Sequence, residues 1–309
     1  CRSFGVSYPQ CRTRSGVFDG AAGDGSVHRM DVAAVVDYTA PDAPEQFALS
    51  LRETGFGVIV NHPLDWSVVE QVYREWNELF DDPAVRGYTT TDSLVGYFPP
   101  DISETAKGFE VRDLKEFFHV YPWSPYPTQV SDAALRYRDA AVQVAMTLLD
   151  WVESQMPADI AARLSMPLSK MMAGSQRTLL RVLRYPPLPD EVPDGAVRAA
   201  AHEDINLLTV LPASDQPGLE LLGADGRWFP VPCDPGSLAV NGGEMLDLAT
   251  EGYYPATTHR VVNPTGEAAT QSRMSLPLFL HPADDVVLAE GRTANEFLMQ
   301  RIAELRGTP

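Results

Sequence analysis

Apolar residues recur at helical spacing through the first part of the chain, up to about residue 177. Periodicity and end signals predict three helices there: residues 41–54 with a stop at Gly55, a segment capped by Asp65, and a segment that begins near Ser131. In the third helix, four apolar residues fall on one face: Leu135, Val142, Met146 and Leu149. We expect that face to pack on the core.

The spacing changes near Thr178. From there to Pro282, short runs of alternating or β-branched residues are separated by Pro, Gly and Asp turns. Such a texture is typical of a β-sandwich or barrel. Two short β-branched runs, at 32–38 and 56–60, predict strands before the helical segments end. The chain closes on a further helical pattern at about 293–306.

Helices first and strands second is the order of an α+β protein rather than of alternating βαβ units. We therefore predict one domain over residues 30–309, with a helical part at about 30–177 and a double-stranded β-helix (jelly-roll) core at about 178–282. The helices at the two ends would brace that core. The closing helix begins with Thr293-Ala-Asn-Glu296, the spacing of a capping box.

Composition narrows the possible partners. The chain has 309 residues and a formal net charge of −18, from 42 acidic and 24 basic side chains. Such a surface repels phosphate backbones and anionic lipid, so we expect no nucleic-acid or membrane partner. No run of 18 apolar residues is present to span a bilayer. The three cysteines (Cys1, Cys11, Cys233) do not form a disulfide framework, and this favours a cytoplasmic protein.

Residues 1–29 lack the patterning of the rest and run into Met30. We interpret them as an extraneous leader or a flexible tail, two alternatives that the sequence leaves open, and set them aside from the fold.

His202 and Asp204, in AAAHEDINLLTVLP, are the first candidate metal ligands. Residues two apart on a strand point to the same face, so both can face one point while Glu203 points away. His259, 55 residues after Asp204 (259 − 204), is the best third ligand. Two imidazoles and one carboxylate leave coordination positions open, as non-haem Fe(II) requires for O₂ and an organic ligand. His-x-Asp alone is weak, because a lone strand histidine is more often a core residue.

A second polar pair strengthens this interpretation. Arg273-Met-Ser275 lies 14 residues past His259 (273 − 259) on an otherwise apolar segment. An arginine that points into a barrel is costly unless an anion meets it. Its guanidinium fork matches a carboxylate, and the neighbouring hydroxyl adds a donor. The alternative is an arginine that faces solvent or pairs with a protein carboxylate.

These segments carry a family resemblance. HEDINLLTVL, THRVVNP and SRMSLPLFLHP resemble the His-x-Asp … His … Arg-x-Ser signature of the isopenicillin N synthase-like Fe(II)/2-oxoglutarate-dependent oxygenases. Upstream, GFGVIVNHPL resembles the family's N-terminal segment, with Gly57 and Pro63 where Phe and Gly are usual. GYFPPDISETAKGFEVRDLKEFFHV and LRVLRYPPLP resemble further family segments, so the resemblance runs from about Met30 to Pro282.

The resemblance implies Fe(II) at His202, Asp204 and His259. It also implies a carboxylate of 2-oxoglutarate at Arg273 and Ser275. Tyr185 is either a further donor to that carboxylate or a strand-end aromatic in the core. Three more residues are candidates for the substrate pocket, with a core role as the alternative for each: Tyr97, Phe117 and His119. His281 ends a predicted strand, and we expect it to be structural.

The activity that the resemblance implies is the oxidation of a small organic molecule by O₂, coupled to decarboxylation of 2-oxoglutarate to succinate and CO₂. Hydroxylation is the default outcome, and desaturation and ring closure are variants. One alternative is a 2-oxoglutarate-independent oxidase, in which the Arg-x-Ser pair binds a carboxylate of the substrate. Another is a non-catalytic small-molecule receptor on the same fold, against which the intact ligand set speaks.

Overall fold

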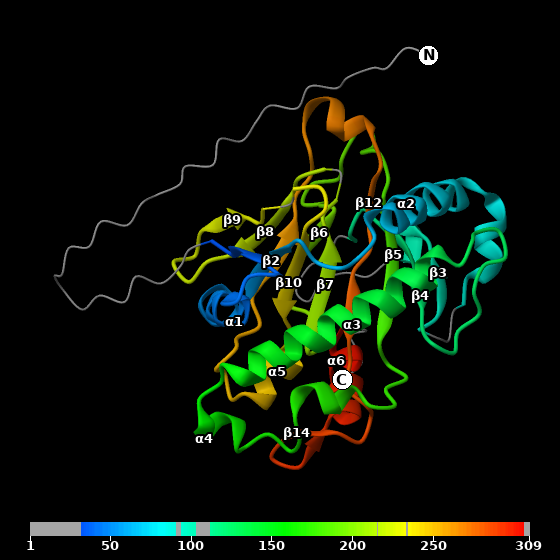
Figure 1. Cartoon of the computed structure of the whole chain (residues 1–309). Helices are drawn as coiled ribbons and strands as arrows, with labels where there is room; N and C mark the ends of the chain where they lie inside the picture. The colour runs from blue at the N-terminus through cyan, green and yellow to red at the C-terminus, as the bar shows by residue number, and fades with distance from the viewer. Residues whose placement is uncertain (1–31, 91–93, 103–111, 215, 233, 306–309) are drawn as a thin grey trace, which may run out of the picture.

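The architecture is known from a computed structural model that describes residues 32–90, 94–102, 112–214, 216–232 and 234–305 (Figure 1). The expected leader at 1–29 lies outside the described residues. The helices are α1 (Ala43–Thr54), α2 (Trp66–Asp81), α3 (Ala133–Ser154), α4 (Ala158–Ala161), α5 (Glu244–Ala249) and α6 (Ala294–Leu305). Short 3-10 turns occupy Pro83–Tyr88, Pro100–Ile102, Leu168–Met172 and Gly266–Thr270.

The strands form two main sheets. The first ten are β1 (Ala34–Asp37), β2 (Phe56–Val60), β3 (Gly96–Phe98), β4 (Glu116–Val120), β5 (Leu179–Tyr185), β6 (Ala199–His202), β7 (Leu208–Pro212), β8 (Leu219–Leu222), β9 (Trp228–Pro230) and β10 (Leu238–Gly242). The rest are β11 (His259–Val261), β12 (Arg273–Ser275), β13 (Leu278–Leu280), β14 (Val287–Ala289) and β15 (Arg292–Thr293). The major sheet runs β1-β2-β10-β7-β13-β5-β4-β3, with β12 beside β5, and the minor sheet runs β6-β11-β8-β9.

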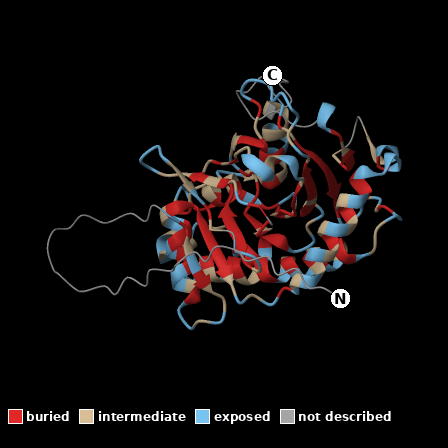
Figure 2. Ribbon diagram, turned by 90° about the horizontal axis from the view of Figure 1, so that it is seen from above, coloured by how far each residue is buried: buried red, intermediate tan, exposed pale blue. Residues whose placement is uncertain are grey.

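The major sheet separates two apolar layers. On one face it packs against the helices, and α3 crosses β7 and β13 (Figure 1). On the other face it packs against the minor sheet, through a cluster that includes Phe56, Leu183, Leu221 and Val261. Figure 2 shows the buried strands between exposed helices and loops. The two-sheet jelly-roll core predicted from the sequence is therefore present, and its interior lies between the sheets.

Strand β4 shows how the sequence alternates between the layers. Phe118 and Val120 belong to the layer under the helices, whereas Phe117 belongs to the layer between the sheets. His119 shares the orientation of Phe117, because alternate residues of a strand point to the same face. Strands β3 and β4 were not predicted from the sequence, and with β1 and β2 they make the N-terminal part more than a helical brace.

The helix ends follow their sequence signals. Asp65 accepts a hydrogen bond from the Ser67 backbone at 3.0 Å, and Thr293 and Glu296 exchange capping-box bonds. Helix α3 is present, but its most buried stripe runs through Tyr137, Val144 and Leu148. Three residues of the face predicted from periodicity lie only at its edge: Leu135, Val142 and Met146. Alanines at 141 and 145 let the stripe approach the sheet closely and displace the larger side chains outward.

Gly55 joins α1 to β2 in a left-handed conformation, with φ of +71°. A Cβ atom placed there would lie 2.0 Å from Oγ1 of Thr257, so only glycine fits. Thr257 lies two residues before His259, and its carbonyl contacts that imidazole. The turn after α1 therefore packs directly on the segment that leads into the candidate metal centre.

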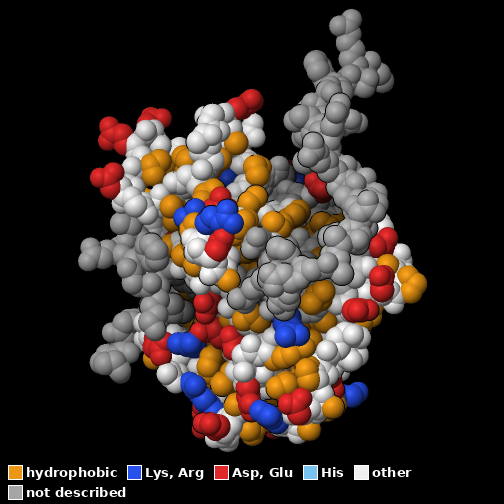
Figure 3. Space-filling view, turned by 90° about the vertical axis from the view of Figure 1, so that its left-hand side faces the viewer, with side chains coloured by type: hydrophobic (Ala, Val, Ile, Leu, Met, Phe, Trp, Pro, Cys, Tyr) orange, Lys and Arg blue, Asp and Glu red, His pale blue; other side chains and the backbone are white. Residues whose placement is uncertain are grey.

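Two surface features bear on partners. Within the parts of the chain that the structure describes, no helix is long and apolar enough to cross a bilayer. On the face shown in Figure 3, acidic and basic side chains are interspersed rather than gathered into one basic patch.

Candidate metal centre

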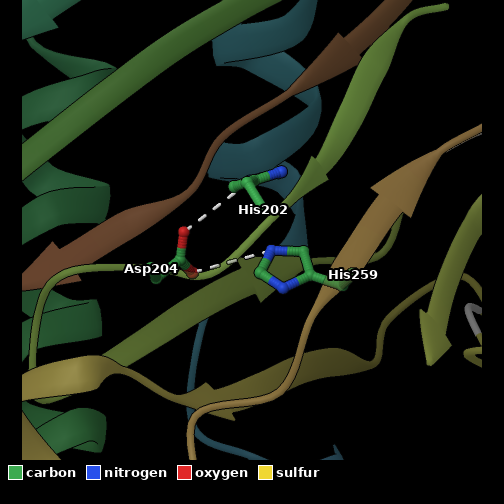
Figure 4. A group of neighbouring side chains, drawn as sticks. All are labelled: His202, Asp204 and His259. Atoms are coloured by element: carbon green, nitrogen blue, oxygen red, sulfur yellow. Dashed lines mark ion pairs between the residues drawn. The ribbon is translucent and has the colours of Figure 1, made fainter. Parts of the chain in front are cut away.

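Three of the residues predicted as ligands meet between the sheets (Figure 4). His202 ends β6, His259 begins β11, and the two are paired across the strands with ring centroids 4.4 Å apart. Asp204 follows β6 and directs its carboxylate between them. One potential ligand atom from each residue lies within 4.8 Å of the other two. This is the one group of at least three His, Cys, Asp or Glu side chains with metal-binding proximity among the described residues.

Backbone carbonyls orient both imidazoles. Nδ1 of His202 lies 2.7 Å from the Ala200 carbonyl, and Nδ1 of His259 lies 3.0 Å from the Thr257 carbonyl. A carbonyl only accepts, so each Nδ1 carries the proton and each Nε2 presents a lone pair. The Nε2 atoms lie 3.9 Å and 3.8 Å from the Asp204 carboxylate oxygens. This tautomer is the one that a metal ion requires.

Asp204 is held by two donors. Oδ2 accepts from Nδ2 of Asn241 at 2.8 Å and from the Thr209 hydroxyl at 2.5 Å. The Thr209 oxygen in turn accepts from Nδ2 of Asn206 at 2.9 Å, which directs the hydroxyl proton toward Asp204. The carboxylate is therefore fixed in orientation as well as in position.

The protonation states suit a cation. Burial lowers the pKa of His202 to about 4, and the neighbouring His259 lowers it further than Asp204 restores it. For Asp204, burial alone raises the pKa, but the nearby His259 and His202 and the bonds from Asn241 and Thr209 outweigh it and lower the pKa. A neutral His202 beside an ionised carboxylate is the donor set that binds a divalent ion of intermediate softness. The residues therefore fit Fe(II).

A cavity connects the triad to the second predicted pair. Arg273 and Ser275, on β12, line it together with Tyr185, which lies opposite Arg273 in the β5–β12 pairing. The same cavity is lined by all three residues of the triad. A small molecule that reaches from the triad to Arg273 would lie wholly between the two sheets.

Arg273 is positioned as an anion receptor. The side chain is 2% exposed, its Nε donates to the Gln216 carbonyl at 3.2 Å, and its carbon Cζ lies 5.3 Å from the Tyr185 ring centroid. Its Nη1 is buried without a hydrogen-bond partner among the described residues. A buried guanidinium nitrogen without a partner is costly, and a carboxylate in the cavity would satisfy it.

A second cavity, of about 190 Å³, opens beside the triad. His202 and Asp204 line it, and His119, one of the residues predicted for the substrate pocket, does so as well. His281 also lines this cavity, although the sequence indicated a structural role. It is 9% exposed, and its Nδ1 is buried without a partner in the described part of the chain.

The other two residues predicted for the pocket lie elsewhere. Tyr97 packs near Phe80 on the helix side of the sheet and donates its hydroxyl to Glu116, so its placement in the substrate pocket needs correction. It points away because it alternates with its strand neighbours. Phe117 faces the interior between the sheets but lies beneath Arg181 rather than on the cavity wall.

Sequence reasoning missed Lys115 and Arg181, which line both cavities. A signal for Arg181 was present. In LRVLRY it shares the period-two face of Leu183 and Tyr185, whereas Arg184 lies on the opposite face and pairs with Glu116. A lone cation on the inward face of a buried strand indicates a site.

A two-sheet jelly roll that holds a His/Asp/His cluster beside two connected cavities defines the class of mononuclear non-haem metal oxygenases. Comparison with known proteins agrees. Residues 177–282 match the model of the 2OG-Fe(II) oxygenase superfamily, and residues 30–142 match the N-terminal model of the non-haem dioxygenase in morphine synthesis.

Individual relatives extend these matches. The chain is 46% identical to a protein of known structure from Shewanella oneidensis assigned as an oxygenase, with a TM-score of 0.80 over 89% of this chain and 99% of that one. A protein from Caulobacter crescentus assigned to the 2OG-Fe(II) oxygenase family is 27% identical, with a TM-score of 0.74 over 89% and 100% of the two chains. Mugineic-acid 3-dioxygenase from Hordeum vulgare is 29% identical over 81% of this chain and 72% of its own length.

The chain belongs to the 2-oxoglutarate- and Fe(II)-dependent oxygenase superfamily, in its isopenicillin N synthase-like group. It is a non-haem iron enzyme with Fe(II) and 2-oxoglutarate as cofactors, and it oxidises a small organic molecule with O₂. The predicted α+β jelly-roll class, the enzyme class and the two cofactors are thereby confirmed.

Proposed function

We propose that His202, Asp204 and His259 hold the Fe(II) and that Arg273, Ser275 and Tyr185 bind the distal carboxylate of 2-oxoglutarate. The observation that carries the proposal is the cavity between the sheets. It has three convergent ligand atoms at one end and the partnerless Nη1 of Arg273 at the other. A 2-oxo acid with a second carboxylate matches both ends.

Each residue has a defined role in this proposal. The Nε2 lone pairs of the two histidines and the Asp204 carboxylate bind the metal, while Asn241 and Thr209 hold that carboxylate in place. Arg273 supplies a charge-assisted, forked contact to the far carboxylate, and Ser275 adds a hydroxyl. Bound Fe(II) with 2-oxoglutarate supplies the O₂-dependent oxidation, with release of succinate and CO₂.

The second cavity is the proposed place of the substrate, because it adjoins the triad on a side that Arg273 does not line. His119 then contributes to the substrate side of the site. We infer hydroxylation of a C–H bond as the default reaction. Residues 30–309 form one oxygenase unit in this proposal, which acts in the cytoplasm on a small molecule rather than on nucleic acid or a membrane, in keeping with the charge of −18.

A metal and ligand titration tests the residue assignment. We expect wild type to bind one Mn(II), as an unreactive substitute for Fe(II), and then one 2-oxoglutarate. Asp204→Ala and His259→Ala should lose the metal while keeping the far-ultraviolet circular dichroism of wild type. Stoichiometric metal binding by either variant would refute the triad. The Glu203→Gln variant is a matched control, because Glu203 is exposed and bonds Thr258 instead.

A further inference from the structure

Two cations stand where the two cavities meet. Lys115 immediately precedes β4 and Arg181 lies on β5, and each lines both the triad cavity and the adjoining one. Neither belongs to the ligand set or to the Arg273 end of the site. Their placement beside His202 and Asp204 bears on what the substrate carries.

Arg181 has a fixed orientation. Its Cζ lies 4.3 Å from the ring centroid of Phe117 and 5.4 Å from that of Phe279. Its Nε donates to Nε2 of His119 at 2.9 Å, and Nδ1 of His119 lies 2.7 Å from the Leu94 carbonyl. The carbonyl places the imidazole proton on Nδ1, which leaves Nε2 as the acceptor that Arg181 needs. His119 is thus a positioning residue for the guanidinium.

Lys115 is anchored to the strand that carries the first metal ligand. It is 6% exposed, and its Nζ lies 2.8 Å from Oδ2 of Asp113. The other oxygen of Asp113 accepts from the Ala200 backbone at 2.9 Å, two residues before His202. Arg181 extends over the ring of Phe117, which lies two residues after Lys115, so both cations approach the same stretch of wall.

The rest of the substrate cavity is mainly apolar. Six apolar side chains line it: Leu94, Leu179, Ile205, Phe279, Leu298 and Ile302. A cation beside such a wall loses hydration, and an anion that enters recovers that loss through a charge-assisted bond. The carboxylate that opens the triad cavity at its other end is already assigned to Arg273.

We propose that the substrate is a small carboxylic acid with an apolar body, whose carboxylate is bound by Arg181 with support from Lys115. This inference rests on the proposed function, because it takes the triad as the metal centre. The planar guanidinium fork matches a planar carboxylate and gives Arg181 the role of specificity-determining residue. The apolar body then lies along the six apolar side chains, beside the metal.

The test uses full-length protein loaded with Mn(II) and saturating 2-oxoglutarate without O₂. Calorimetric titration measures the dissociation constants of three acids (butanoate, hexanoate and 3-phenylpropanoate) and of their primary amides, which match them in shape but lack the charge. We expect at least one acid to bind roughly tenfold or more tightly than its amide. Arg181→Gln should abolish that preference, and Arg181→Lys should retain part of it.

Two controls separate this role from a structural one. The 2-oxoglutarate dissociation constant should be unchanged in Arg181→Gln, because Arg273 is untouched. Arg136→Gln removes the same charge from a half-exposed residue outside both cavities and should keep the wild-type preference for acids. A series in which no acid binds more tightly than its amide, silence included, overturns the proposal. So does a preference that survives in Arg181→Gln. Failure to load Mn(II) or 2-oxoglutarate instead refutes the proposed metal and co-substrate site, and the inference falls with it.

Discussion

Nδ2 of Asn241 donates to Oδ2 of Asp204 at 2.8 Å, across two strands that are not neighbours in sequence. Asn241 lies on β10 and pairs with Thr209 on β7, so both donors to Asp204 stand side by side on the major sheet. The minor sheet supplies the two histidines. The candidate metal centre is therefore assembled only when the two sheets pack together.

Removing one of these donors should weaken metal binding without removing a ligand. For Thr209→Val, which keeps the shape but loses the hydroxyl, we expect the Mn(II) affinity to fall roughly 10- to 100-fold. Metal titration measures this. Thr250→Val is the control, because that buried hydroxyl bonds a helix carbonyl instead. Equal metal affinities in wild type and Thr209→Val would show that the second donor is sufficient by itself.

Arg273 should affect 2-oxoglutarate and not the metal. Loss of one partner of a buried charge pair costs on the order of 2–5 kcal/mol, so Arg273→Gln should raise the KM for 2-oxoglutarate roughly 30-fold or more. Arg273→Lys should lose less, since it keeps the charge but not the fork. Succinate release against 2-oxoglutarate concentration measures both, once a substrate has been identified.

A control for Arg273 is Arg227→Gln, which removes the same charge from an exposed side chain paired with Asp225. Its KM should match that of wild type. If wild type consumed O₂ with its substrate and formed no succinate, the site would instead serve a 2-oxoglutarate-independent oxidase.

The sequence was sufficient for the triad because residues at i and i+2 on a strand must share a face. It was also sufficient for the pairing of Arg273 with Ser275 on one cavity wall. It was insufficient for Tyr97, because a strand flanked by turns gives no sign of which face is inward. His281 was missed for another reason: the sequence shows that it ends a strand but not that a cavity opens there.

Gly55 should be the more sensitive of two glycines with nearly the same backbone conformation. Gly55 and Gly174 have φ of +71° and +73°, but a Cβ at Gly174 meets nothing within 4 Å, whereas at Gly55 it meets Thr257. Gly174→Ala should cost only the left-handed strain, about 1 kcal/mol. Gly55→Ala should cost about 1–3 kcal/mol more, because the segment before His259 must move. Urea unfolding of both variants measures the difference, and equal costs would contradict it.

His281 should make the protein less stable in mild acid. Burial lowers its pKa from 6.5 to about 4. Between these values the unfolded chain binds the proton more readily than the folded one, so this contribution is complete above pH 6.5 and is lost as the pH falls toward 4. At pH 5 the loss is about 2 kcal/mol, from roughly 1.5 pH units below 6.5. We expect the free energy of unfolding of metal-free wild type to fall by that much more than that of metal-free His281→Gln between pH 7 and pH 5, measured by urea titration. Parallel pH profiles for the two proteins would show that His281 is protonated as readily in the folded chain as in the unfolded one, and that the wall it forms beside the metal centre is open to water.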